Sequence, residues 1–278
     1  MKLEKMILKE IEAKGILTKS KLPDADYVIN PYIGCRSSCV YCYAEFMKVF
    51  TGHKEDWGTF VDVKINAVDL IKKNGKYHGK NILFGSATDA YQVVEGKYKI
   101  TRGILKALIP YQPKIEILTK SALVIRDIDV LKQFNNATVG VSISTLNKNY
   151  SRQLEPITSS PQLRLEALKK CKEAGLRTYV FLSPIFPFIT EVEEIMKISN
   201  DYADYFMFEN LNLRPFNKKT IFDFIEKNEP DLLSKYKEIY IKKESTYWTE
   251  MEQKVKDICK FYGKKDRIYF HHGGFSEK

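Results

Sequence analysis

The sequence predicts an α/β protein built as a partial (β/α)6 TIM-like barrel with a C-terminal helical extension. From Tyr27 onward, short runs of β-branched or aromatic residues alternate with longer helical patterns, which is typical of parallel βα units. Six such units are too few for a complete eight-stranded barrel. With 278 residues, of which 44% are hydrophobic, the chain can form a large core.

Six strands are predicted, each a short run of mostly apolar residues. In chain order they cover residues 27–31, 81–85, 114–119, 137–144, 177–183 and 203–210. A further stretch, TFVDVKIN at 59–66, fits an extra strand and an extended connection equally well.

Helices are predicted between these strands, where apolar residues recur at spacings of three and four. The clearest cover residues 100–109, 122–134, 161–175 and 190–202. We expect Gly175 to end the third of them. We expect Thr190 and Glu193 to form a capping box at the start of the fourth.

The composition divides the chain into three parts. Residues 1–26 form a charged leader, for which we expect a loop or a short helix. Residues 27–215 form the barrel. Residues 216–278 are rich in Lys, Glu and aromatic residues, and are interpreted as helices followed by a strand-like RIYFHH, an extension that packs across the mouth or side of the barrel.

Charge and cysteine content suggest the environment and the partners. Lys and Arg total 45 against 35 acidic residues, a net charge of +10 that would attract phosphates, although solvated Lys-rich helix faces explain it equally well. We expect no membrane span and a cytoplasmic location, because the sequence shows neither a long apolar run nor a secretory signal. Five cysteines, three of them within eight residues, fit reduced thiols rather than a disulfide framework.

The segment NPYIGCRSSCVYCYAEF carries the spacing C-x3-C-x2-C at Cys35, Cys39 and Cys42. Three thiolates on one loop can hold three irons of a [4Fe–4S] cluster, whose usual ligand set is four cysteines. One iron is then open to chelation by the amino and carboxylate groups of S-adenosylmethionine. These three residues are the predicted metal ligands and the catalytic centre.

Zinc is the simplest alternative for a cysteine cluster. It requires four ligands, and His53 is a conceivable fourth, although the helix-like YAEFMKVF between them would point it away. Cys171 and Cys259 stand singly in helical patterns, and we assign them no chemistry.

Several segments in this order resemble the spore photoproduct lyase-like, or "DNA repair photolyase", group of the radical S-adenosylmethionine superfamily. The resemblance covers roughly residues 27–190. It rests on NPYIGCRSSCVYCYA, FGSATDAYQVVEGKYKITRGIL, ILTKSALVIRDIDVL, VSISTLN, RQLEPITSSPQLRLEALKKCKEAGL and FLSPIFPFI.

The resemblance implies an enzyme that cleaves S-adenosylmethionine reductively at the [4Fe–4S] cluster. The resulting 5′-deoxyadenosyl radical would abstract hydrogen from a substrate, with electrons from an external reductant of flavodoxin or ferredoxin type. Residues implied to bind the cofactor are the loop aromatics Tyr41 and Tyr43, the segment with Ser86, Thr88 and Asp89, then Lys120 and Ser142.

The residues themselves point to the same place. Barrel enzymes build their sites at the carboxyl ends of strands, where this chain repeatedly has polar residues. Each has a simpler interpretation: Asp89 as a helix cap, Lys120 as a solvated loop residue, Ser144 as part of a turn. Arg152 and Glu155 fit an ion pair that stabilises the loop after the fourth strand.

One departure from the family bears on the reaction. In spore photoproduct lyase a hydrogen-donating cysteine stands where this chain has Ser86, and a hydroxyl cannot replace a thiol as a hydrogen-atom donor. The sequence therefore favours a radical enzyme acting on another substrate, with a nucleic acid or nucleotide preferred over a peptide or small metabolite. A non-catalytic, metal-stabilised interaction protein is the alternative from another class. His271 and His272 are left without a role.

Overall fold

A computed structural model describes residues 6–22, 24–74, 77–242 and 245–271. Its main sheet has eight strands in the order β11-β10-β9-β8-β7-β6-β3-β2, and every neighbouring pair is parallel except β2 with β3. The strands are β2 Leu17–Lys19, β3 Tyr27–Ile29, β6 Asn81–Phe84, β7 Lys114–Thr119, β8 Ala137–Ile143, β9 Arg177–Ile185, β10 Tyr205–Asn210 and β11 Lys265–Tyr269. The predicted α/β class is confirmed, and β3 and β6 to β10 are the six predicted strands.

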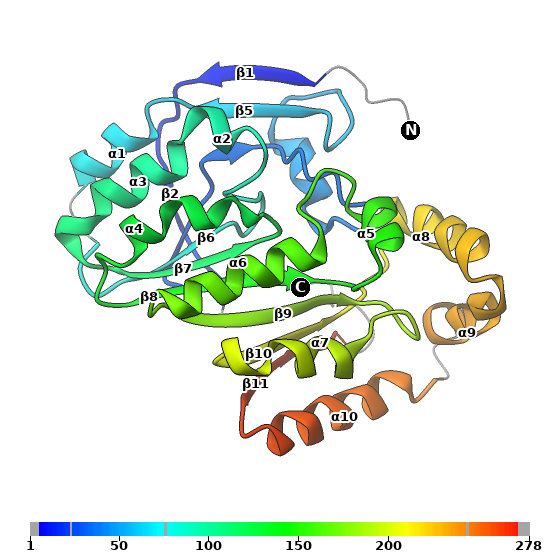
Figure 1. The fold of residues 1–278 in the computed structure, drawn as a ribbon. Helices are drawn as coiled ribbons and strands as arrows, with labels where there is room; N and C mark the ends of the chain where they lie inside the picture. Colours follow the sequence, from blue (N-terminus) through cyan, green and yellow to red (C-terminus); the bar gives the residue numbers. More distant parts are fainter. Residues whose placement is uncertain (1–5, 23, 75–76, 243–244, 272–278) are drawn as a thin grey trace.

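Helices cover the outer face of this sheet (Figure 1). They include α1 Ala67–Asn74, α2 Glu95–Tyr98, α3 Ile100–Leu108, α4 Ile128–Leu131, α5 Lys148–Leu154, α6 Pro161–Glu173 and α7 Val192–Ser199. The predicted helix at 161–175 is confirmed, because Ser160 caps the first turn, Pro161 opens it and Gly175 follows the end at a φ of +85°. The predicted helix at 122–134 begins instead as the 3-10 helix η3, Ala122–Asp127.

The predicted capping box at Thr190 and Glu193 is wrong. The hydroxyl of Thr190 donates to the carbonyl of Ser144 at 2.6 Å and accepts from the N–H of Phe186 at 2.8 Å, so it does not cap α7. The Thr190 side chain forms a long-range hydrogen bond to Ser144, just after β8, instead of capping the helix as the local sequence predicts.

The inner face of the sheet has its own apolar cluster, formed by Tyr179, Tyr205 and Met207 with Leu118, Phe181 and Tyr269. The alternate residues Phe206 and Phe208 of β10 pack outward against α7 and α10. Gly140 leaves room for the Tyr179 ring, since a Cβ there would lie 2.1 Å from Tyr179 Cζ. Side chains therefore pack against one another on the inner face of the sheet.

The N-terminal residues form strands, contrary to the expected loop or short helix. β1 (Ile7–Ile11) pairs in parallel with β5 (Phe60–Lys64), and β5 pairs antiparallel with β4 (Tyr32–Ile33). This second sheet settles the undecided stretch 59–66 as a strand and lies apart from the main sheet in Figure 1. β4 ends directly before Gly34, so the small sheet supports the cysteine loop.

The C-terminal region contains helices and one strand of the main sheet. α8 (Pro215–Asn228) and α9 (Leu233–Lys237) contribute to one apolar cluster, and α10 (Tyr247–Phe261) covers the sheet before the chain enters β11. Asp24 Oδ2, between β2 and β3, accepts hydrogen bonds from Arg267 Nη1 at 3.0 Å and from the Tyr269 hydroxyl at 3.1 Å. Asp24 thus joins the two margins of the sheet.

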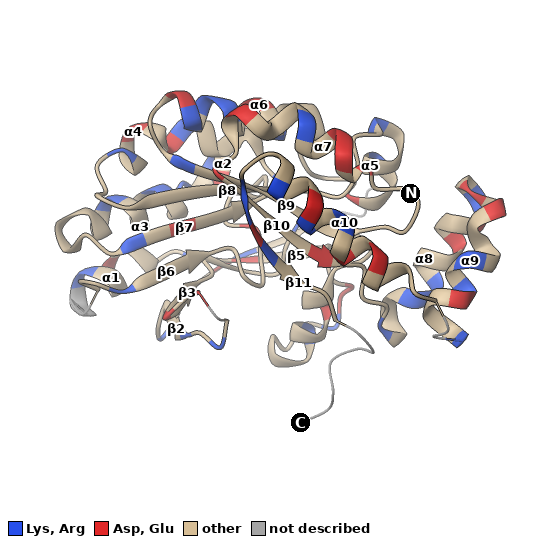
Figure 2. Ribbon diagram, turned by 90° about the horizontal axis from the view of Figure 1, so that it is seen from below, with Lys and Arg blue, Asp and Glu red and all other residues tan. Residues whose placement is uncertain are grey.

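Charged residues of both signs alternate along the outer helices (Figure 2). Pairs four residues apart, such as Lys170 with Glu166 and Lys219 with Asp223, account for part of this pattern. Among the described residues, no helix has the length and apolar character needed to cross a membrane.

Candidate functional site

The cysteine loop lies against β5. Cys35 is buried, Cys39 and Cys42 are half-buried, and all three are free thiols. A Cβ at Gly34 would stand 2.4 Å from the carbonyl oxygen of Phe60, and Gly34 has a φ of +80°. Only glycine allows this close approach, which fixes where the loop leaves the small sheet.

Gln92 clamps the backbone on both sides of Cys35. Its Oε1 accepts from the N–H of Arg36 at 2.8 Å, and its Nε2 donates to the carbonyl of Gly34 at 3.2 Å. The N–H of Asp89 points at Cys35 Sγ from 3.5 Å. The segment after β6 therefore positions the first thiol, a contact that the sequence did not reveal because Gln92 carries no titratable group.

Burial raises the pKa of all three thiols, that of Cys42 to about 11. Lys120 lowers the pKa of Cys39 and Cys42 but does not outweigh burial. Near neutral pH the protonated thiols dominate without a metal, and metal ions would supply the positive charge that holds thiolates. This donor set fits an iron–sulfur cluster.

The described residues offer little support for zinc. No group of three His, Cys, Asp or Glu among them is arranged to hold a single metal ion. A [4Fe–4S] cube differs because each thiolate binds its own iron. His53 is engaged elsewhere, since Nδ1 lies 2.9 Å from Glu55, Nε2 lies 3.1 Å from Asp62, and the ring stacks on Phe60.

Asn30 shapes the segment from Ser86 to Thr88. Its Nδ2 donates to Ser86 Oγ at 3.1 Å, and its Oδ1 accepts from the N–H groups of Ala87 and Thr88 at 3.1 and 3.4 Å. Among the described residues, the buried Thr88 Oγ1 has no hydrogen-bond partner. Buried hydroxyls nearly always have one, so this atom marks a place where a polar ligand fits.

Asp89 joins the ends of β6 and β7. Its carboxylate accepts from the N–H groups of Tyr91 and Lys120, each at 2.8 Å, and from the Thr119 hydroxyl at 2.7 Å. It fixes the backbone from which the Lys120 side chain departs. Asp89 therefore makes more contacts than the simpler interpretation, a helix cap, requires.

Glu155 is the centre of a buried polar network. It pairs with Arg164, accepts from the Tyr41 hydroxyl, and accepts from Ser144 Oγ at 3.0 Å. The predicted ion pair between Arg152 and Glu155 is therefore wrong. The partner is Arg164 of α6, the helix that follows the loop. Burial acts to raise the pKa of Glu155, but the charges of Arg164 and Lys120 outweigh it and lower that pKa.

The remaining predicted residues differ in how deeply they are buried. The Tyr43 hydroxyl donates to the carbonyl of Ser86, so the cysteine loop contacts the segment after β6. The Lys120 ammonium lies 5.8 Å from the centre of the Tyr41 ring. Ser142 is fully buried, and its hydroxyl donates to the Ser183 carbonyl at 2.9 Å. His272 lies outside the described residues.

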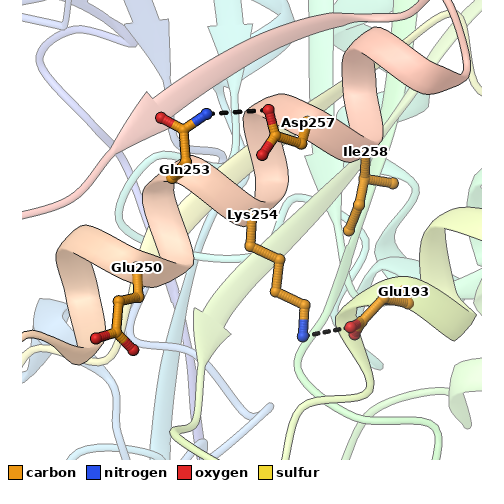
Figure 3. Close-up of a pocket in the computed structure, with 6 residues that line it drawn as sticks. All are labelled: Glu193, Glu250, Gln253, Lys254, Asp257 and Ile258. Carbon is orange, nitrogen blue, oxygen red and sulfur yellow. Dashed lines mark hydrogen bonds and ion pairs between the residues drawn. The ribbon is translucent and has the colours of Figure 1, made fainter.

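A surface depression of about 460 Å³ between α7 and α10 lies away from these residues (Figure 3). Within it Lys254 pairs with Glu193, and Gln253 donates to Asp257 at 2.9 Å. Its polar groups pair with one another and present no catalytic arrangement.

A mostly parallel α/β sheet with three clustered thiols on the loop after its first parallel strand defines the radical S-adenosylmethionine class. Residues 29–200 match the model of the Radical SAM superfamily, and the chain belongs to this family. An uncharacterised protein of Methanocaldococcus jannaschii is 40% identical over 222 residues, which cover 80% of this chain and 83% of that protein. One from Mycobacterium tuberculosis is 29% identical over 251 residues, 83% of this chain and 73% of that protein.

Solved structures share the fold. Spore photoproduct lyase complexed with dinucleoside spore photoproduct superposes with a TM-score of 0.68 at 19% identity, covering 95% of this chain and 82% of that one. A double mutant of the lyase with bound AdoMet and the same dinucleoside gives 0.67 at 18% identity, with the same coverage. Streptococcus suis SuiB bound to S-adenosylmethionine gives 0.55 at 14% identity, covering 88% of this chain and 49% of that one.

Proposed function

We propose that this protein is an enzyme that cleaves S-adenosylmethionine and uses the product to abstract hydrogen from a substrate. Cys35, Cys39 and Cys42 would hold the [4Fe–4S] cluster. The observation that carries the proposal is that one loop bears three free thiols and that the first, Cys35, meets the N–H of Asp89, the residue after Thr88. The buried hydroxyl of Thr88 has no partner among the described residues. Membership of the Radical SAM superfamily supports it.

When bound, the cluster and S-adenosylmethionine would supply one-electron cleavage and a carbon-centred radical, with electrons from a flavodoxin- or ferredoxin-type protein. The chain's own residues would bind and orient the cofactor: Tyr41, Tyr43, Ser86, Thr88, Asp89, Lys120 and Ser142. Asp89 and Lys120 provide opposite charges at neighbouring strand ends, which suits a zwitterionic amino acid moiety. Ser142, whose hydroxyl is bound to Ser183, would act from behind the others.

A nucleic acid or nucleotide is the proposed substrate class. The net charge of +10 favours a phosphate-bearing molecule, and the likeness to a lyase complexed with a dinucleoside is consistent with one. Ser86 provides a hydroxyl that already accepts from Asn30, so we do not propose the lyase reaction itself.

The first test is anaerobic reconstitution with iron and sulfide, followed by reduction with S-adenosylmethionine. We expect visible iron–sulfur absorbance and release of 5′-deoxyadenosine, both lost in Cys35→Ala, Cys39→Ala and Cys42→Ala. Cys171→Ala, which changes a buried thiol in α6, is the matched control and keeps both. Zinc in place of iron, or cleavage by Cys35→Ala, would contradict the proposal and favour a non-catalytic metal-stabilised protein.

The second test concerns the substrate. Binding of a labelled single-stranded DNA or RNA is measured over a series of salt concentrations, and we expect affinity to fall steeply as salt rises because phosphate contacts release counterions. Absence of binding at low salt would exclude the nucleic-acid version and favour a peptide or small metabolite.

A further inference from the structure

The carboxyl ends of β9, β10 and β11 carry polar side chains that the proposed function leaves without a role. Tyr205 and Met207 of β10 face the barrel interior, so Glu209 is the next residue on that face. The same alternation places Ser183 on the inner face of β9, two residues after Phe181. Both therefore stand at the mouth end of the barrel.

Glu209 is held in place yet reachable. The Ser183 hydroxyl donates to Glu209 Oε2 at 2.6 Å, and His271 Nε2 lies 3.8 Å from Glu209 Oε1. The N–H of His271 donates to Asn210 Oδ1 at 2.8 Å, which fixes the chain after β11. A side-chain exposure of 29% leaves the Glu209 carboxylate open to a ligand.

The backbone is irregular at this residue. The register between β9 and β10 shifts between Phe208 and Asn210: Ser183 and Pro184 of β9 lie opposite Glu209 alone, so the extra residue belongs to β9. Such bulges redirect a side chain and are frequent next to active sites. A serine on a bulge that donates to the carboxylate of the neighbouring strand is an arrangement that packing alone does not require.

Ser183 connects Glu209 to the proposed cofactor site. Its carbonyl accepts from the Ser142 hydroxyl at 2.9 Å, and its own hydroxyl donates to Glu209 Oε2 at 2.6 Å. The residues proposed for the cofactor stand at the ends of β6, β7 and β8, whereas Ser183, Glu209 and His271 stand at the ends of β9, β10 and β11.

We infer that Glu209, oriented by Ser183 and His271, binds the substrate by accepting a hydrogen bond from an N–H group of a nucleobase. The inference rests on the proposed substrate class. A carboxylate accepts from base amino groups but repels phosphates, so Glu209 would read the base and not the backbone.

The test compares two fluorescein-labelled 15-mer DNA strands, one containing all four bases and one abasic, on anaerobically reconstituted full-length protein at low salt. We expect Glu209→Ala to weaken binding of the base-containing strand by about ten-fold, with Glu209→Gln intermediate. Because each substitution removes a negative charge, binding of the abasic strand should stay equal or tighten. Glu193→Gln removes a negative charge from α7 and is the matched control, with no loss on either strand.

The two failures are distinguishable. If the wild type binds neither strand, the nucleic-acid substrate class is wrong and this inference falls with it. If it binds the base-containing strand and both Glu209 variants bind that strand equally or more tightly, only the inference is overturned. An equal loss on both strands also overturns it, since the carboxylate would then act through the fold; thermal melts of both variants check that cause.

Discussion

At the scale of single residues, the contacts that hold the thiols in place matter as much as the thiols. Gln92 forms hydrogen bonds with the backbone N–H of Arg36 and the carbonyl of Gly34, and both groups lie in a partly buried loop. Gln92→Ala would leave them unpaired at a cost of about 1–3 kcal/mol each at most. We expect less iron bound per chain after reconstitution and weaker visible absorbance, whereas Gln133→Ala, on an exposed helix end, changes neither.

The Glu155–Arg164 pair predicts a pH dependence of stability. The folded-state pKa of Glu155 is lowered from 4.5, so its contribution is complete above about pH 4.5 and is lost as pH falls through the folded pKa. Glu155→Gln breaks a buried pair and should cost about 3–5 kcal/mol at pH 7. Urea unfolding at pH 7 and pH 4 should show the loss shrinking on acidification. Glu166→Gln, in an exposed pair, should cost under about 1 kcal/mol at either pH.

What could be predicted at this scale was the chemistry visible in residue type. Spacing identified Cys35, Cys39 and Cys42 as candidates. Charge at a strand end identified Asp89 and Lys120. Gln92 and Asn30 were missed because neutral amides have many roles, and only the folded loop shows which backbone groups they meet. Arg164 was missed because it stands inside a helical pattern, where arginine is ordinarily solvated.

At the scale of elements, Gly85 controls how the chain leaves β6. It has a φ of +91°, and a Cβ there would stand 2.7 Å from the carbonyl oxygen of Leu118. Gly85→Ala should therefore displace the segment Ser86 to Asp89, lower the melting temperature and reduce 5′-deoxyadenosine release. Gly96→Ala in α2 is the control: it meets no atom within 4 Å and should be neutral or slightly stabilising. Equal melting temperatures for the two variants would contradict this account.

Elements defined by strong local patterns were predictable, and those defined by distant partners were not. The strand at 137–144 is rich in β-branched residues, and the helix at 161–175 carries its own start and stop residues. β1 is charged and half-exposed, and it forms a strand because β5 offers an edge to pair with. The capping box failed for the same kind of reason, since Ser144 lies 46 residues from Thr190.

At the scale of the whole molecule, Asp24 connects the two margins of the main sheet. Asp24→Asn replaces a charged acceptor for Arg267 and Tyr269 and should destabilise the fold by about 1 kcal/mol. We expect a lower urea midpoint and faster amide exchange in β11 than in the wild type, with β7 unaffected. Asp69→Asn, in an exposed pair with Lys72, should change neither quantity.

Because of that contact, one boundary between strands of the main sheet is easier to separate than the others. Neighbouring strands are held by backbone ladders, whereas β11 and the β2–β3 hairpin are bridged by the two hydrogen bonds of one carboxylate. Separating β11 from the β2–β3 hairpin costs about 0.5–1.5 kcal/mol per hydrogen bond, whereas separating any other neighbouring pair breaks a backbone ladder. The main sheet therefore opens most easily at Asp24.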